Sequence, residues 1–243
     1  MKIALAIPHL PDGGARDASM QRLRARLGIR EEMLPIEDYY REFTEKLPNH
    51  EWAHRVWTWF ASREDCEWGV QLQDDTLTPD GKYFWPILRA QLAAALGDVV
   101  GLATVHPRAP ALLRAGHRWF RTRAWTIGWG VAYRTRWVRD VLLPWREQVL
   151  EHALVSNEDS FVNDCVAAHG GSVYHPIPSL VDHDLSLEST YASVDDGHRR
   201  STVYLLSNMH ASTFDVGEMS SPDFWRPKDV VPYEAFPDKK GSP

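Results

Sequence analysis

The 243-residue sequence has few of the features that mark disulfide-rich, zinc-binding or membrane-spanning proteins. Its two cysteines, Cys66 and Cys165, cannot form a disulfide framework and lack the spacing of a zinc site, so we expect a reducing compartment. No apolar run approaches the roughly 20 residues that a membrane-spanning helix needs. The apolar N-terminal segment is too short for a signal peptide and is expected to form a first strand. A cytoplasmic protein without a membrane anchor is therefore predicted.

Acidic residues are almost missing from one long segment. Between Arg108 and Arg146 there are nine arginines and a single acid, Asp140, so this segment has a formal charge of +8. Because the whole chain has a net charge of −6, the remainder carries −14. Five of the eleven tryptophans lie in the same segment, and aromatic rings can stack on bases or sugars. The asymmetry indicates an anionic partner on one side of the molecule, although a solvated basic face would give the same pattern.

The chain is long enough for one sizeable domain, and no internal repeat interrupts it. Apolar periodicity and turn residues predict that strands and helices alternate up to about residue 104. This alternation predicts an α/β fold with a mostly parallel sheet and helices on both faces. The expected strands are Lys2–Ile7, Glu31–Ile36, Trp68–Leu72 and Val99–Thr104, and the expected helices are Ala15–Leu27, Glu51–Ser62 and Tyr83–Leu96.

The pattern changes in the second half of the chain. A strand, a glycine turn and a second strand are expected over Ala124–Tyr133, and short strands over 172–175, 179–181 and 202–206. Helices are expected over Trp137–Leu150 and Glu158–Ala168. From Ser220 the sequence predicts an extended tail. We therefore predict a main domain over residues 1–184 and a less regular extension over 185–243.

The most informative stretch is Glu67–Pro79, in which an apolar run is followed by two adjacent acids. The expected strand Trp68–Leu72 leads directly into Gln73-Asp74-Asp75 and then into a turn. Open α/β sheets bind ligands at the carboxyl ends of their strands. Carboxylate oxygens suit Mg²⁺ or Mn²⁺, which can hold a diphosphate. A solvated turn contains the same residues, so this pair alone does not define a site.

Two further motifs follow. Glu158 and Asp159 come after a potential N-cap, Asn157, and His183 ends the segment Pro178–His183 after a short strand. The helix dipole alone favours acids in a first turn, and a lone histidine is more often packed or exposed than a ligand. It is the order of the three motifs on an alternating α/β background that favours a function.

These motifs resemble those of the GT-A glycosyltransferases, above all small members encoded by bacteriophages. The resembling features are the L-x-D-D form at Leu72–Asp75, the later E-D pair and a PSLVDH segment, and they span about residues 2–184. The resemblance implies a GT-A, Rossmann-like sheet and a nucleoside diphosphate sugar as donor, which we expect to be a UDP-sugar. It also implies Mn²⁺ or Mg²⁺ as cofactor.

The resemblance further implies roles for individual residues. Asp75 and His183 are expected to be metal ligands, and Asp159, beside Glu158, the general base of an inverting reaction. Gln73 stands where an acid is usual, so metal binding is expected to be weaker. Donor binding is expected from Ile7, Pro8, Asp17, Gln73, Asp74, Gly128, Trp129 and Gly130. Trp129 is also a typical core residue.

This chemistry requires these residue types. Departure of the leaving group puts charge on the nucleoside diphosphate, which a divalent cation neutralises. The attacking hydroxyl loses its proton, which a carboxylate can take. The helix dipole would keep Asp159 ionised in the first helical turn. A retaining reaction fits the same spacing, so the stereochemical outcome stays open.

The acceptor is the least determined part of the prediction. Some phage enzymes of the resembling type glycosylate hydroxymethylated bases in DNA, and a DNA acceptor agrees with the basic Arg108–Arg146 segment. The overall pI near 6 argues against a typical DNA-binding protein. The residues expected at this acceptor surface are Arg114, Arg118, Arg121, Arg123, Trp125 and Arg134.

Three alternatives stay open. The acceptor can be a cell-surface glycan or a protein instead of DNA. Gln73 in place of an acid is compatible with a catalytically silent module that only binds nucleic acid. A nucleotidyltransferase would also use a metal on an α/β sheet but would release pyrophosphate. The segment Asp12–Arg16 is too short a hint of the glycine-rich phosphate loop that would favour it.

Overall fold

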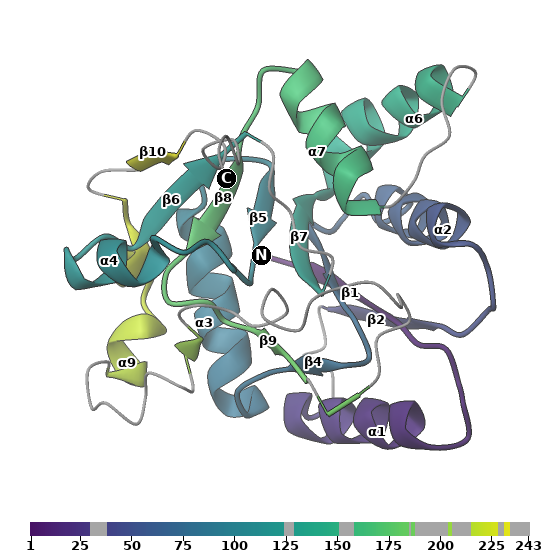
Figure 1. Ribbon diagram of the computed structural model, residues 1–243, viewed down its shortest axis with the longest axis horizontal. Helices are drawn as coiled ribbons and strands as arrows, with labels where there is room; N and C mark the ends of the chain where they lie inside the picture. The colour runs from purple at the N-terminus through teal and green to yellow at the C-terminus, as the bar shows by residue number, and fades with distance from the viewer. Residues whose placement is uncertain are drawn as a thin grey trace, which may run out of the picture.

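The computed structural model describes residues 1–29, 38–123, 129–150, 158–184, 186–187, 204–205, 215–227 and 231–233. Within these residues an eight-stranded sheet runs through the molecule in the order β10-β6-β8-β5-β7-β3-β1-β2 (Figure 1). Its strands are β1 (Ile3–Pro8), β2 (Tyr39–Phe43), β3 (Trp68–Leu72), β5 (Val99–Gly101), β6 (Trp119–Thr122), β7 (Gly130–Arg134), β8 (Val173–Pro176) and β10 (Val231–Tyr233). Two short strands, β4 (Thr76–Leu77) and β9 (Asp182–His183), form a separate antiparallel pair.

Helices flank this sheet. They are α1 (Ala15–Leu27), α2 (Asn49–Ala61), α3 (Gly81–Ala94), α4 (Ala109–Arg114), α5 (Thr135–Trp137), α6 (Leu143–Leu150), α7 (Glu158–Ala168), α9 (Val216–Met219) and α10 (Pro222–Trp225). Four of the seven strand pairs in the main sheet are parallel, and the three antiparallel pairs all involve β6 or β7. The chain therefore has the expected mixed α/β fold with a mostly parallel central sheet.

The sheet is buried on both faces. Along β1 the larger side chains Ile3, Leu5 and Ile7 belong to the apolar layer shared with α1 and α3. The small side chains Ala4 and Ala6 belong to the opposite layer, which contains residues of α2 and α7. Successive side chains of a strand point to opposite faces, so this run of apolar residues fills two layers at once.

Local sequence explains where α1 ends and how closely α2 approaches the sheet. Gly28 has a left-handed φ of +68°, and its N–H contacts the carbonyls of Ala25 and Arg24, which closes α1 after Leu27 as predicted. Gly69 in β3 faces the ring of Phe60, and a Cβ atom at Gly69 would overlap that ring. A glycine is therefore required where α2 crosses β3.

Several predicted elements differ from the structure. The predicted strand Glu31–Ile36 lies outside the described residues, and the strand beside β1 is Tyr39–Phe43. The strand beginning at Val99 ends at Gly101, and α4 was not predicted. The helix predicted to begin at Trp137 begins at Thr135 and continues through a π-helical segment, Val138–Leu142. Pro144 has no N–H group, so it cannot donate a hydrogen bond to the carbonyl four residues earlier. This agrees with the wider, π-helical turn over Val138–Leu142.

Two predictions near the C-terminus were wrong. The short strand is Asp182–His183 rather than 179–181, where only a bridge from Ser179 to Tyr204 forms. The segment after Ser220 is not simply an extended tail, because it contains α10 and a strand that pairs with β6. Trp225 is fully buried and anchors this segment against β6 and α3. None of the helices in the described residues is long and apolar enough to cross a membrane.

Candidate functional site

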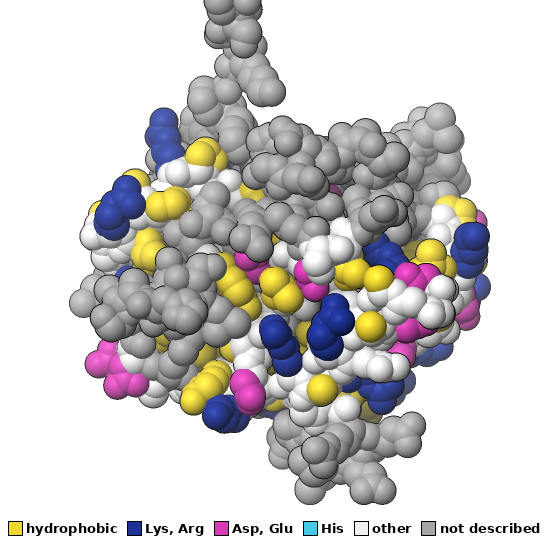
Figure 2. Space-filling view, turned by 60° about the horizontal axis from the view of Figure 1, so that its bottom comes forward, with side chains coloured by type: hydrophobic (Ala, Val, Ile, Leu, Met, Phe, Trp, Pro, Cys, Tyr) yellow, Lys and Arg dark blue, Asp and Glu magenta, His cyan; other side chains and the backbone are white. Residues whose placement is uncertain are grey.

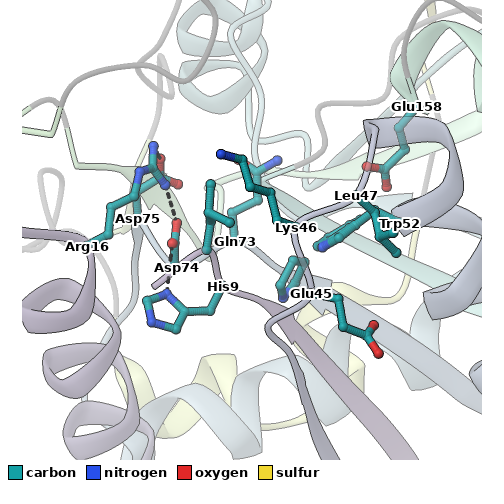
Figure 3. Close-up of a pocket in the computed structure, with 12 residues that line it drawn as sticks. His9, Arg16, Glu45, Lys46, Leu47, Trp52, Gln73, Asp74, Asp75 and Glu158 are labelled. Atoms are coloured by element: carbon teal, nitrogen blue, oxygen red, sulfur yellow. Dashed lines mark hydrogen bonds and ion pairs between the residues drawn. The ribbon is translucent and has the colours of Figure 1, made fainter. Parts of the chain in front are cut away.

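A cleft of about 240 Å³ opens where β1 and β3 end (Figure 3). Parallel neighbouring strands expose their carboxyl ends on the same edge of a sheet, so the residues after Pro8 and after Leu72 meet there. The wall opposite them comes from the segment between β2 and α2, and one end is closed by α7. The lining residues are Pro8, His9, Leu10, Arg16, Glu45, Lys46, Leu47, Trp52, Gln73, Asp74, Asp75 and Glu158.

Asp74 lies at the centre of a charged cluster and is 3% exposed. Its Oδ2 is 3.0 Å from Nδ1 of His9, and its Oδ1 accepts a 2.7 Å hydrogen bond from Nη1 of Arg16. The other ring nitrogen of His9 is 2.6 Å from Oδ1 of Asp17, and Oδ2 of Asp17 accepts from the N–H of Gly13. An ionised carboxylate only accepts, so the His9 ring donates from both nitrogens when both acids are ionised.

Asp75 faces a different partner. Its Oδ2 lies 3.0 Å from Nε2 of His183, because antiparallel pairing of β4 with β9 places Thr76 opposite His183. The N–H of Asp184 donates to the Asp75 carbonyl at 2.8 Å, which ties the two segments together. The Trp129 ring packs edge-on against the His183 ring, with centroids 4.7 Å apart. His183 of the third motif thus contacts Asp75 of the first, although more than 100 residues of chain separate them.

The side chains around Asp75 include oxygen and nitrogen ligands that can coordinate Mg²⁺ or Mn²⁺. Within the described part of the chain, no group of three or more His, Cys, Asp and Glu side chains forms a ready-made metal centre. The buried Oδ1 of Asp75 has no hydrogen-bond partner among the described residues. Mg²⁺ sites often use one or two carboxylates and take their remaining ligands from substrate phosphates and water. Asp75 and His183 fit such an open site better than a closed protein cage.

Arg16 reduces the negative charge that a cation would meet. Its guanidinium pairs with Asp74 and lies 3.9 Å from Oδ2 of Asp75. Gln73 adds an amide and no charge. The cleft therefore combines the acids Asp74 and Asp75, with Glu45 and Glu158 farther along its lining, with the cationic side chains of Arg16 and Lys46. This mixture suits a negatively charged ligand that brings or shares a cation.

Glu158 closes the far end of the cleft. It is the first residue of α7, is 7% exposed, and its Oε1 accepts a 2.5 Å hydrogen bond from Nε2 of Gln71. Burial raises the pKa of Glu158 to about 8, and the charge of Asp159 acts in the same direction. The hydrogen bond from Gln71 opposes this rise. Glu158 is therefore mostly protonated at neutral pH.

The cleft brings together part of the predicted donor and metal set. Pro8, Gln73, Asp74, Asp75 and Glu158 line it, and His183 is in contact with Asp75. Asp159 is half-buried and is not among the lining residues.

The remaining donor residues are near the cleft without lining it. Ile7 is in the core, and Asp17 reaches Asp74 only through His9. Trp129 is 4% exposed and contributes its carbonyl, which accepts from Oγ1 of Thr76 at 2.7 Å. Gly130 pairs with Leu72 in the sheet. Gly128 lies outside the described residues.

Sequence reasoning missed seven lining residues: His9, Leu10, Arg16, Glu45, Lys46, Leu47 and Trp52. The first three belong to the loop after β1 and to α1, where the resemblance implied donor binding by Pro8 and Asp17 only. The others come from a segment without any motif. Only the placement of β2 beside β1 carries that segment over the ends of β1 and β3.

The predicted acceptor arginines are not gathered at the cleft. Arg118 and Arg121 lie at β6, four strands away from β3, or roughly 19 Å at the usual spacing between strands. Arg134 is opposite Trp68, at the other end of β3 from the cleft, where it pairs with Glu67. Arg114 ends α4 and Arg123 follows β6, and both are exposed, whereas Trp125 lies outside the described residues.

The visible charges on one face are also mixed. On the face shown in Figure 2, Lys and Arg side chains stand among Asp and Glu side chains rather than in an unbroken basic patch. Part of the arginine charge is paired locally, as in the contacts of Arg136 with Asp98 and of Arg139 with Asp140. The contact with Asp98 therefore offsets part of the net charge of +8 along the segment.

Comparison with known proteins gave structural likenesses only. No family model and no curated protein sequence matches the chain. A197 from STIV is 12% identical, with a TM-score of 0.45 over 75% of this chain and 84% of its own. Mannose-1-phosphate geranyltransferase from Thermus thermophilus is 14% identical, with a TM-score of 0.41 over 72% and 73%. CMP:2-keto-3-deoxy-manno-octonic acid synthetase complexed with CTP is 12% identical, with a TM-score of 0.41 over 72% and 89%.

Proposed function

We propose that this protein is a metal-dependent glycosyltransferase that moves a sugar from a nucleoside diphosphate sugar, expected to be a UDP-sugar, to a hydroxyl acceptor. The observation that carries the proposal is the meeting of Asp75 and His183 at the cleft where β1 and β3 end. Ligands of α/β sheets bind at this edge. The likenesses to the transferase and the synthetase have TM-scores too low to add to it.

In the proposed complex, Asp75 and His183 hold Mn²⁺ or Mg²⁺ together with the donor diphosphate. The cation, when bound, neutralises the charge that develops on the leaving diphosphate. Arg16 and Lys46 line the same cleft and add positive charge toward the phosphates. Asp74, held by His9 and Arg16, keeps the guanidinium in place.

The reaction itself needs a proton acceptor on the side opposite the leaving group. The carboxyl pair Glu158 and Asp159 at the start of α7 supplies it, and the sequence prediction favoured Asp159. Attack from the face opposite the diphosphate inverts the configuration at the anomeric carbon. The separation of Glu158 from Asp75 at the other end of the cleft supports this arrangement (Figure 3).

Calorimetric titration of UDP, with and without Mn²⁺, tests the donor site. Wild type is expected to bind UDP more tightly with Mn²⁺, and Asp75→Asn and Asp75→Ala are expected to lose that gain. Asp140→Ala, which removes an exposed acid that does not line the cleft, is the matched control and should bind as wild type does. Equal UDP binding by wild type and Asp75→Asn at every Mn²⁺ concentration would contradict the metal site.

The released product separates the enzyme classes. A glycosyltransferase releases UDP from a UDP-sugar, whereas a nucleotidyltransferase releases pyrophosphate from a nucleoside triphosphate. A silent module would bind without releasing either. Chromatography of both reactions with Mn²⁺ present therefore distinguishes the three alternatives.

For the acceptor, we propose a hydroxymethylated base in DNA, with a glycan or protein hydroxyl as the alternative. The excess of arginines over acids in Arg108–Arg146 supports a polyanion. Because β6 lies roughly 19 Å from β3, DNA contacting both would have to run across several strands. Replacing Arg118, Arg121 and Arg123 by Ala should weaken DNA binding and flatten its salt dependence while UDP release continues. Unchanged DNA affinity would exclude this acceptor surface.

A further inference from the structure

We infer that Glu158, rather than Asp159, takes the proton from the attacking hydroxyl, and that Gln71 positions the Glu158 carboxyl group for this step. The inference rests on the proposed transferase function and assigns one of its roles. Glu158 faces the cleft and Asp159 is not among the residues that line it.

The position of Glu158 in the cleft wall supports this role. The Glu158 side chain extends from α7 toward Leu47 and Trp52 in the cleft wall (Figure 3). Its Oε1 is held by Nε2 of Gln71 at 2.5 Å, from the strand that leads into the Asp74–Asp75 pair. A group held from β3 has a defined orientation toward a ligand bound at the end of the same strand.

The hydrogen bond from Gln71 to Glu158 supports the positioning role of Gln71. Gln71 is fully buried, and its Oε1 has no hydrogen-bond partner among the described residues. Leaving one polar atom of a buried amide without a hydrogen bond costs free energy. We therefore infer that the hydrogen bond made by the other atom, Nε2 of Gln71, has a role. Here the amide N–H group steadies one carboxyl oxygen of Glu158. Gln71 therefore acts as a positioning residue.

The groups that surround Glu158 also support its role as a base. The groups facing Glu158 from other elements are Gln71 on β3 and Tyr133 on β7, and Asp159 is its neighbour on α7. Burial, and then the charges of Glu158 and Asp159, raise the pKa of Tyr133 well above its ordinary value, so Tyr133 stays neutral. A general base works best when its pKa is near the working pH, and burial brings the pKa of Glu158 to about 8.

Other ionisable groups line the same cleft. They are the basic side chains Arg16 and Lys46, the ring of His9, and the acids Glu45, Asp74 and Asp75. Asp159 serves in this arrangement as the nearby charge that keeps the Glu158 carboxylate basic.

The step balances in atoms and electrons. The hydroxyl proton passes to the Glu158 carboxylate, and the oxygen lone pair forms the bond to the anomeric carbon. The bond from that carbon to the β-phosphate oxygen breaks, and its electron pair leaves with the nucleoside diphosphate. Glu158 then returns the proton to solvent.

The test uses UDP-glucose and UDP-galactose as probes with Mn²⁺, water as acceptor, and UDP release as readout from pH 6 to 9. Wild-type release should rise about tenfold per pH unit below the pKa of the base and level off above it. Glu158→Gln should lose at least about 100-fold, and Asp159→Asn should keep most activity with its break at lower pH. Gln71→Leu should move the break to higher pH, because the bond from Gln71 lowers that pKa.

Two controls separate the outcomes. Glu67→Gln, an exposed acid at the far end of β3, should leave the profile unchanged. UDP affinity should be the same in wild type and Glu158→Gln, which excludes misfolding. UDP release by Glu158→Gln at the wild-type rate overturns this inference alone. No UDP release by wild type from either probe overturns the proposed function and the inference with it.

Infrared spectra supply a measurement without turnover. Wild type should show a protonated carboxyl band at pH 6.5 that disappears by pH 9 and is missing in Glu158→Gln. If wild type and Glu158→Gln have the same carboxyl band at pH 6.5, Glu158 is already ionised and the inference fails.

Discussion

Replacing Glu158 by Gln should make the stability of this protein less sensitive to pH. The substitution keeps the shape of the side chain and removes the ionisable group at the end of the cleft. In the folded protein burial raises the pKa of Glu158 to about 8 from its ordinary value of 4.5. In the unfolded chain the same group returns to its ordinary value.

The sign follows from which state binds the proton. Below pH 4.5 Glu158 is protonated in both states, so its ionisation affects neither. Between pH 4.5 and about 8 the folded state keeps the proton and the unfolded state loses it, so wild-type stability falls as pH rises. Above pH 8 the buried group is ionised in both states, and the loss is complete.

The magnitude has an upper bound. At about 1.4 kcal/mol for each unit of difference between the two pKa values, the loss is at most about 5 kcal/mol. Since a domain of this kind is stable by about 5–15 kcal/mol, even half of that difference is measurable. Relative to wild type, Glu158→Gln should therefore gain stability progressively from pH 5 to pH 8.

Urea unfolding followed by tryptophan fluorescence at pH 5, 6, 7, 8 and 9 measures the difference. The change in unfolding free energy should grow by about 1 kcal/mol per pH unit over the lower part of this range. Glu67→Gln, in which the replaced acid is half exposed, is the control and should follow wild type. A constant difference between Glu158→Gln and wild type at all five pH values would refute the reasoning.

Two further predictions concern the packing that supports the cleft. Gly69→Ala should lower the unfolding free energy by about 1–3 kcal/mol in urea, because the new methyl group overlaps the Phe60 ring. Wild-type stability in this variant would show that α2 does not press on β3. Trp225→Ala should lower it by about 3–5 kcal/mol and speed limited proteolysis near residue 225, because the fully buried indole donates to the Met219 carbonyl. Wild-type protease resistance would contradict the docking of this segment.

The Arg108–Arg146 segment shows how charges that are adjacent in the sequence are separated on folding. Nine arginines follow one another in the sequence with a single acid among them. In the structure they are distributed over α4, β6, β7 and the helical run after Thr135. Two of them pair with acids from outside the segment, Arg134 with Glu67 and Arg136 with Asp98. Sequence charge is therefore a poor guide to surface charge when the segment forms several elements.

Local sequence by itself determined the elements that carry the site. The apolar run before Gln73 predicted β3, Gly28 closed α1 at the predicted residue, and α7 spans Glu158–Ala168 as predicted. These features depend on short-range periodicity, turn residues and capping, all of which act within a few residues of chain. The alternation of such elements was enough to predict the α/β class.

Only the tertiary structure decided which side chains meet. The approach of His183 to Asp75 depends on the pairing of β4 with β9, and the presence of Glu158 but not Asp159 among the cleft-lining residues depends on how α7 is turned. Lys46 reaches the cleft because β2 lies beside β1, whereas His9 and Arg16 come from the loop after β1 and from α1. These contacts join residues far apart in sequence, and their energy comes from burying apolar layers on both faces of the sheet, which no short window of sequence contains.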